Sequence, residues 1–319
     1  MVVVGLDEIG TLVAANVLKH PELELVGVVD PSLAGRRLPS LIPGAPDLEI
    51  EAAAQRLYLE AKGGAALISA GPSLDDVADE IEQAVRAGLH VVSGCEELSN
   101  PWFVDPELSD DLDALAQERG VAILGTGANP GFVMDRLVVT LGGVVGEIRH
   151  VEVVRRVDAR DKPRLWKTIG AGLSTAEFES RADAGVLGHV GLGESCALVV
   201  DGLALAVDEV EEEIDPILAE RPVEVGALRI PAGGVVGVRQ VAHASDEGRE
   251  VVRLTLEIGV GLADPGDRIR IQGDPKVELE IPGGIEGDRA TAWAIVNAVP
   301  RVAAADAGII EVLDLPAGR

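Results

Sequence analysis

The chain is short of positive charge. Its 27 Lys and Arg residues face 54 Asp and Glu residues, a formal net charge of −27 over 319 residues. A chain this acidic repels nucleic acid and anionic membranes, so we expect neither as a partner. No apolar run reaches the ~18 residues that a membrane-spanning helix needs. The acidic excess is most simply a solvated surface rather than a device for binding cations.

Cysteine and histidine are equally scarce. The two cysteines, Cys95 and Cys196, make no disulfide framework, and the five histidines show no metal-ligand spacing. We therefore expect no metal centre. The apolar run 2–4 follows Met1 directly and meets a turn, which is unlike a signal peptide. These features favour a cytoplasmic protein, long enough at 319 residues for two domains.

The first thirty residues predict a strand, a glycine turn, a helix and a second strand. An apolar run, 2–4, enters the turn at Gly5, periodic apolar residues follow over 9–18, and the run 25–29 closes on Asp30. Asp30 lies about twenty residues past Gly10, where a dinucleotide-binding unit holds a ribose hydroxyl. The pattern G-x-G-x-x-G is broken, however, because Asp7 stands where the middle glycine belongs.

The carboxylate at Asp7 leaves two hypotheses open. A pyrophosphate at the helix N-terminus would meet negative charge there, which weakens binding. Alternatively, Asp7 and Glu8 complement the helix dipole in a unit that binds no cofactor. Arg36, just past Asp30, could hold a 2′-phosphate or be a surface residue, so the choice between NAD and NADP also stays open.

Strands and helices alternate up to about residue 126. Predicted strands at 65–70, 90–93 and 121–124 are separated by helices, one capped by Ser73 and one by Asp105 with Pro106 behind it. This alternation is typical of an open parallel sheet, which binds ligands beyond the carboxyl ends of its strands. Two loops, 93–102 and 125–135, follow the carboxyl ends of the predicted strands 90–93 and 121–124, so we expect candidate site residues there.

Each of these loops has a functional and a structural interpretation. Glu96 beside Cys95 is a candidate for acid–base work, whereas Glu97 could supply charge to a helix start and Cys95 could be a small buried apolar residue. Asn129, in a rigid Asn-Pro-Gly turn, could present its amide to a carbonyl or amine, or be part of a plain turn.

Beyond residue 135 the pattern changes to α+β. Strand-like runs at 144–157, 235–242, 251–260, 268–272 and 277–281 enclose a helix opened by the capping box at Ser174 and a second helix ending near residue 206. An alanine-rich helix from Asp288 to Val299 should be buried, against the first domain or in a dimer. The predicted fold is α/β, a Rossmann-like parallel sheet with a second α+β domain, divided as 1–133, 134–286 and 287–319.

The sequence resembles the 2,4-diaminopentanoate dehydrogenase family and its natural amine dehydrogenase relatives, which are built like dihydrodipicolinate reductase. The segments that carry the resemblance cover most of the chain in order: 95–98 with 101–102, 125–127 with 129–135, 170–173, 188–192 with 194–195, and 287–288 with 290–292 and 297–298. Departures are Asp7 and the altered strand end at Ser69 and Ala70, where relatives commonly carry threonine beside the nicotinamide.

The resemblance implies an oxidoreductase that uses NADP or NAD in the reversible oxidative deamination of a primary amine or diamino acid. Its partners would be a small-molecule amine or ketone and ammonia, and it would form a homodimer. By the motif match Glu96 is catalytic and Asn129 binds substrate; Arg155 (or Arg156) and His189 are weaker substrate-binding candidates. The cofactor-binding candidates are Gly5, Asp7, Ile9, Gly10, Asp30, Arg36, Ala70 and Cys95.

A second hypothesis keeps the fold without the activity. A catalytically impaired paralogue that binds a ligand or acts as a scaffold would also show a carboxylate at Asp7. A cyclic-imine reductase is disfavoured, because the second domain lacks a paired histidine and lysine motif of the dihydrodipicolinate reductase kind.

Overall fold

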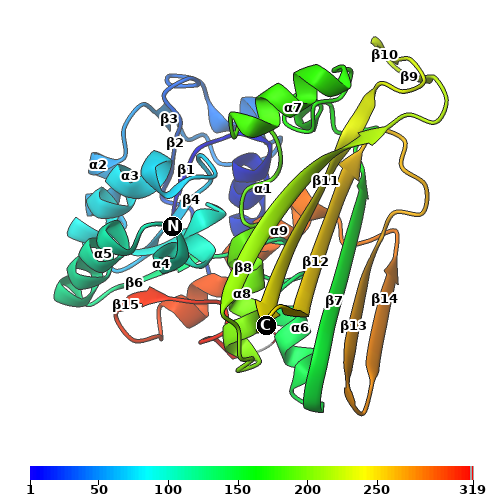
Figure 1. Cartoon of the computed structure of the whole chain (residues 1–319). Coiled ribbons are helices and arrows are strands. Elements are labelled where there is room, and N and C mark those ends of the chain that lie inside the picture. Colours follow the sequence, from blue (N-terminus) through cyan, green and yellow to red (C-terminus); the bar gives the residue numbers. More distant parts are fainter. Residues whose placement is uncertain (317, 319) are drawn as a thin grey trace. The chain divides into compact units, whose positions relative to one another are not determined.

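A computed structural model describes residues 1–316 and 318 (Figure 1). The chain folds into two compact units, one formed by 1–132 with 286–319 and the other by 133–285. Within the described residues no helix is long and apolar enough to cross a membrane.

The first unit is built on a seven-stranded sheet. Its strand order is β3-β2-β1-β4-β5-β6-β15, and every neighbouring pair is parallel. This order reverses between β1 and β4, the point at which doubly wound sheets bind their ligands. The strands are β1 (Val2–Val4), β2 (Gly27–Val29), β3 (Ile50–Glu51), β4 (Ala65–Ile68), β5 (His90–Ser93), β6 (Ala122–Gly125) and β15 (Gly308–Ile310).

Helices cover both faces of this sheet. Val2 and Val4 belong to a core shared with α2, α3 and α5, whereas Val3, of opposite parity, points to the other face, where α1 and α9 pack together (Figure 1). The helices are α1 (Glu8–Val17), α2 (Gln55–Glu60), α3 (Leu74–Arg86), α4 (Pro101–Val104), α5 (Pro106–Arg119) and α9 (Gly287–Val302), with single turns at Leu38–Ser40 and Glu97–Ser99.

The second unit is a six-stranded mixed sheet of order β14-β13-β7-β12-β11-β8. Only β7 and β12 run parallel; the other neighbours are antiparallel. The strands are β7 (Gly146–Asp158), β8 (Glu209–Leu218), β11 (Val235–Asp246), β12 (Arg249–Gly259), β13 (Gly266–Asp274) and β14 (Val277–Pro282), and a separate hairpin joins β9 (Val223–Val225) to β10 (Leu228–Ile230).

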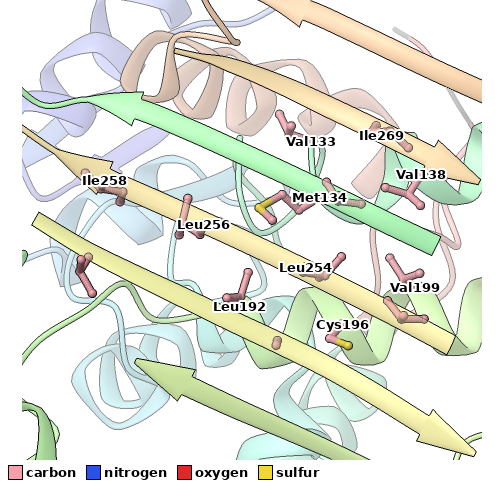
Figure 2. Close-up of a cluster of buried hydrophobic side chains, with 14 of the residues drawn as sticks. Val133, Met134, Val138, Leu192, Cys196, Val199, Leu254, Leu256, Ile258 and Ile269 are labelled. Carbon is pink, nitrogen blue, oxygen red and sulfur yellow. The ribbon is translucent and has the colours of Figure 1, made fainter. Parts of the chain in front are cut away.

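One face of this sheet is the core of the second unit. Leu254, Leu256 and Ile258, which alternate along β12, pack with Leu192 and Cys196 of α8, as Figure 2 shows. The alternation places every second residue of each strand on this apolar face. The helices of the unit are α6 (Arg136–Gly142), α7 (Thr175–Asp183) and α8 (Leu192–Gly202), with a single turn at Pro163–Leu165.

The observed fold confirms the predicted fold class, and several boundaries differ. The strand predicted at 65–70 ends at Ile68, and the strand predicted at 144–157 runs from Gly146 to Asp158. Several elements were not predicted, among them β3, α4, α6, β8 and β15. The C-terminal helix α9 forms part of the first unit, where Thr291 Oγ1 accepts a hydrogen bond from Ala128 N at 3.0 Å.

Candidate active site

The turn after β1, residues 5–10, has the geometry of a dinucleotide-binding loop, and we call it the cradle. Gly5 has φ +81°, and a Cβ there would lie 2.2 Å from the carbonyl oxygen of Ser69 at the end of β4. A Cβ on Gly10 would lie 1.9 Å from the carbonyl oxygen of Gly5, so the helix packs directly on the turn. These are the roles of the first and last fingerprint glycines, the tight turn and the close helix–strand contact.

Asp7 caps the helix that follows this turn. Its Oδ1 accepts hydrogen bonds from Gly10 N at 2.7 Å and from Ser69 Oγ at 3.0 Å, and its backbone is extended with φ −64°. The carboxylate therefore satisfies one of the N–H groups left open at the start of α1. Position 7 needs no glycine for its own conformation, so the cradle is kept while its charge is changed.

Asp30 links the end of β2 to the same turn. Its Oδ2 accepts from Leu6 N at 2.9 Å, and its Oδ1 accepts from Ser32 N at 2.9 Å and Ser32 Oγ at 2.6 Å. Partial burial would raise the pKa of Asp30, but the bonds from Ser32 and Leu6 outweigh it and hold the pKa below its usual value. An ionised carboxylate therefore lies at the position that binds a ribose hydroxyl in dinucleotide-binding folds.

The remaining cofactor candidates lie around the same sheet edge. Ile9 is half-buried in the first turn of α1, and Ala70 is exposed just past β4. Arg36 is exposed and reaches Ser40 Oγ at 3.4 Å. Cys95 is buried, donates from Sγ to Pro72 O at 3.2 Å, and has its pKa raised to about 12 by burial. The small apolar interpretation of Cys95 fits these contacts.

Glu96 is held between two anchored neighbours. On one side Cys95 bonds to Pro72; on the other, Glu97 Oε2 accepts from Leu74 N at 2.6 Å, which caps α3. The main-chain oxygen of Glu96 accepts from Ser99 Oγ at 2.7 Å. The predicted structural role of Glu97 is confirmed, and the loop fixes the backbone from which the half-buried Glu96 projects.

Asn129 lies in the loop after β6, the strand next to β5. Ser93 and Gly125 are paired at the ends of these strands, so the Glu96 and Asn129 loops leave the same edge of the sheet. A Cβ on Gly125 would lie 2.3 Å from the backbone of Leu98, which shows how closely the two loops approach. The structure thus gathers the first-unit candidates at the carboxyl edge of one sheet.

Arg155 and His189 belong to the second unit. Arg155 is buried on β7, where Nη1 contacts Asp267 Oδ1 at 2.7 Å and Nη2 donates to Ile285 O at 2.8 Å. Arg156 points to the opposite face and pairs with Glu257 at 2.6 Å. Because its described contacts are internal, Arg155 has a structural role, and its binding of substrate stays a prediction.

His189 lies in the loop that leads into α8. Its main-chain N–H donates to Gln240 Oε1 at 2.6 Å, and its main-chain carbonyl oxygen accepts from Gln240 Nε2 at 2.9 Å. Gln240 and Asp267 did not emerge as candidates from the sequence. Both are polar residues at core-facing positions of a strand, Gln240 in phase with Val238 and Ala242, and that phase is the signal that could have found them.

No group of three or more His, Cys, Asp or Glu residues within 1–316 is arranged to hold a metal ion. The residues of the first unit fit a dinucleotide instead. Strand order, the two glycines of the turn and Asp30 at the end of β2 all match the requirements of the cofactor, and Asp7 is the departure.

Comparison with known proteins identifies the family. The 2,4-diaminopentanoate dehydrogenase C-terminal domain matches residues 132–319, more than half of the chain. The chain belongs to the 2,4-diaminopentanoate dehydrogenase family. It is 28% identical to 2,4-diaminopentanoate dehydrogenase of Acetoanaerobium sticklandii, covering 100% of this chain and 94% of that one, and 25% identical to an amine dehydrogenase of Streptomyces virginiae, covering 99% and 95%.

The fold agrees with that of a solved amine dehydrogenase. An amine dehydrogenase from Mycobacterium smegmatis superposes with a TM-score of 0.87 over 100% of this chain and 96% of that chain, at 24% identity. The predicted family, the Rossmann-like fold and the assignment to NAD(P)-dependent dehydrogenases are confirmed for this 2,4-diaminopentanoate dehydrogenase family member.

Proposed function

We propose that the protein catalyses the reversible oxidative deamination of a primary amine or diamino acid with NAD or NADP. In this reaction the substrate loses a hydride and a proton to become an imine, and water converts the imine to a ketone and ammonia. Membership of the 2,4-diaminopentanoate dehydrogenase family supports the reaction class. The observation that carries the assignment of the site is the common sheet edge from which the cradle, Glu96 and Asn129 all project.

The cradle would hold the cofactor through backbone. Gly5, Gly10 and the open N–H groups at the start of α1 would face the pyrophosphate, and Asp30 would face the adenosine ribose. When bound, the nicotinamide accepts or supplies the hydride. Asp7 reduces the affinity without removing the cradle, so an impaired paralogue is the weaker explanation of this residue.

Glu96 would move the protons. A carboxylate beside the reacting carbon can take a proton from the attacking water and return it to the departing amine, so one group serves both directions. The anchored neighbours Cys95 and Glu97 keep its backbone fixed. Asn129 would orient the substrate nitrogen or carbonyl oxygen, since its amide can donate and accept.

The test is turnover by wild type, Glu96→Gln and a control, Glu118→Gln, an exposed carboxylate on α5. Wild type with ammonia and 4-oxo acids or simple ketones should consume NADH or NADPH. Glu96→Gln should lose about 10²-fold or more in kcat, the usual contribution of a positioned acid–base group, while binding the dinucleotide normally. Absence of consumption by wild type from mildly acidic to alkaline pH would refute the function; full activity in Glu96→Gln would refute the role of Glu96.

We also propose a cytoplasmic homodimer. Both cysteines are free thiols, which suits a reducing compartment. On the second sheet, the face opposite the apolar core carries ion pairs such as Arg156 with Glu257 and Arg270 with Glu152, which neutralise one another and suit contact with a second copy. Light scattering during size-exclusion chromatography tests the dimer, and a monomer at all concentrations would refute it.

A further inference from the structure

The side-chain amide of Gln240 forms hydrogen bonds with both the main-chain N–H and the main-chain carbonyl of His189. We call this pair of bonds the clamp. Gln240 Oε1 accepts from His189 N at 2.6 Å and Gln240 Nε2 donates to His189 O at 2.9 Å. These two bonds imitate the pairing of one more strand residue, although His189 lies in a loop. Gln240 is 3% exposed, so water does not compete for them.

Glu212 decides which way round the amide of Gln240 lies. The second N–H of Gln240 Nε2 donates to Glu212 Oε1 at 2.8 Å. If the amide were flipped, its oxygen would face both the Glu212 carboxylate and the His189 carbonyl, three acceptors without a proton between them. Glu212 also accepts from Gly193 N at the start of α8, so it is itself fixed.

The loop of His189 fits this clamp closely. Gly188 has φ +106°, and a Cβ there would lie 3.0 Å from Gln240 Nε2. Gly188 N donates to Thr168 O at 2.9 Å, which ties the loop down on its other side. The backbone around His189 is therefore determined by contacts before any ligand is present.

The clamp lies in one row of residues across the apolar face. Asp267 pairs with Arg155, Arg155 with Leu256, and Leu256 with Gln240 in the strand register. At about 4.8 Å per strand, Arg155 and Gln240 are roughly 10 Å apart on the same face. Two predicted substrate-binding residues are thus each held by a buried polar residue of this row. Asp267 holds Arg155, and Gln240 holds His189.

We propose that Gln240 and Glu212 are positioning residues that fix His189 for contact with the amine substrate. This inference rests on the proposed function, because it needs an amine substrate, and it takes up the prediction from the sequence that His189 binds that substrate. Gln240 acts on His189 through its main chain, and Glu212 acts through the amide of Gln240. Neither residue is assigned a contact with the substrate.

The first experiment needs no activity. Hydrogen exchange of the His189 amide is compared in wild type, Gln240→Leu, and the control Gln272→Leu, an exposed glutamine on β13. Loss of the accepting Oε1 should speed exchange at His189 by about fivefold, and the control should leave it unchanged. If Gln240→Leu fails to fold, Gln240→Met is used instead, because it keeps the length of the side chain and lacks both the accepting oxygen and the N–H donors, so exchange at His189 should speed up by a similar factor. Unchanged exchange at His189 in the folded variants overturns the proposal.

The second experiment separates positioning from general damage. Gln240→Leu should raise KM for the amine by about fivefold with kcat nearly unchanged, as expected when ground-state binding is lost, and dinucleotide affinity should stay constant. Glu212→Leu should act in the same direction, and Glu212→Gln, which can still accept from Gln240, should restore most of the loss. In a His189→Ala background Gln240→Leu should raise KM no further.

The two failures are distinguishable. An inactive wild type in which Gln240→Leu still speeds exchange at His189 refutes the proposed function while the clamp stands. An active wild type in which the KM effects of His189→Ala and Gln240→Leu multiply refutes action through His189 while the proposed function stands.

Discussion

Replacing Asp7 separates the two effects that its carboxylate has on the cradle. Asp7→Asn keeps a side-chain oxygen that can accept from Gly10 N and Ser69 Oγ, at 2.7 and 3.0 Å in the native structure, and removes the charge. Asp7→Ala removes both the charge and the cap. Asp7→Gly restores the fingerprint and, at an N-cap, costs helix stability by only a few tenths of a kcal/mol.

The expected magnitudes differ between the variants. A carboxylate about 4 Å from a phosphate charge costs about 1 kcal/mol in bulk water and about 4 kcal/mol at the effective dielectric of a protein surface. An intermediate value of about 1.5–3 kcal/mol corresponds to a dinucleotide affinity about 10- to 100-fold higher in Asp7→Asn. Asp7→Ala should gain similarly in affinity and lose about 1 kcal/mol in the free energy of unfolding, the usual cost of a lost N-cap.

Calorimetric titration with NADH and NADPH, with urea unfolding in parallel, measures both quantities. Asp105→Asn is the matched control, because Asp105 caps α5 by accepting from Leu108 N at 3.0 Å, away from the cradle. The gain from Asp7→Asn should shrink in ~1 M salt, where the Debye length is about 3 Å. If Asp7→Asn binds no more tightly than wild type, the carboxylate does not face the pyrophosphate and the repulsion argument is refuted.

Three further predictions concern single groups. Asp267→Leu should lower the free energy of unfolding by about 3–5 kcal/mol in urea, because it strands the buried charge of Arg155, whereas Arg155→Met with Asp267→Leu should be nearly neutral; equal losses would contradict this. NADH should bind more tightly than NADPH, because a 2′-phosphate would meet ionised Asp30, and since the pKa of Asp30 is lowered the preference should persist as pH falls toward ~4; tighter NADPH binding would contradict it. Burial raises the pKa of Cys95 and Cys196 to about 12, so an alkylating reagent at pH ~8 should modify neither in the folded protein and both in urea; rapid labelling of the native protein would refute this.

The first unit could be predicted from local signals. Ser73 and Asp105 cap α3 and α5 as expected, with bonds to Asp76 N and Leu108 N. Apolar runs between these caps left little choice but a parallel sheet covered by helices. The capping box at Ser174 in the second unit is also present. Caps succeed because both partners of the hydrogen bond lie within four residues of each other.

Elements without such local signals were missed. The strand β8 reads Glu-Val-Glu-Glu-Glu-Ile-Asp-Pro, in which consecutive acidic residues hide the alternation and Pro216 argues against a strand. It is nevertheless an edge strand, paired only with β11 within the described residues, where charge and proline are tolerated. The parallel pairing of β7 with β12 was equally invisible, because about a hundred residues separate the partners.

The candidate site divides in the same way. Glu96 and Asn129 could be found because each follows a buried strand, and the ends of parallel strands meet at one edge. Gln240 lies 51 residues from His189 and 28 from Glu212, so no local pattern joins them. Yet a lone amide in phase with core residues must find partners once it is buried, because an unsatisfied polar group costs about 1–3 kcal/mol. A polar residue at a core-facing position of a strand therefore indicates a polar partner elsewhere in the chain. In this sheet Arg155 and Gln240 are two such residues, and the second unit's site candidates are Arg155 itself and His189, which Gln240 binds.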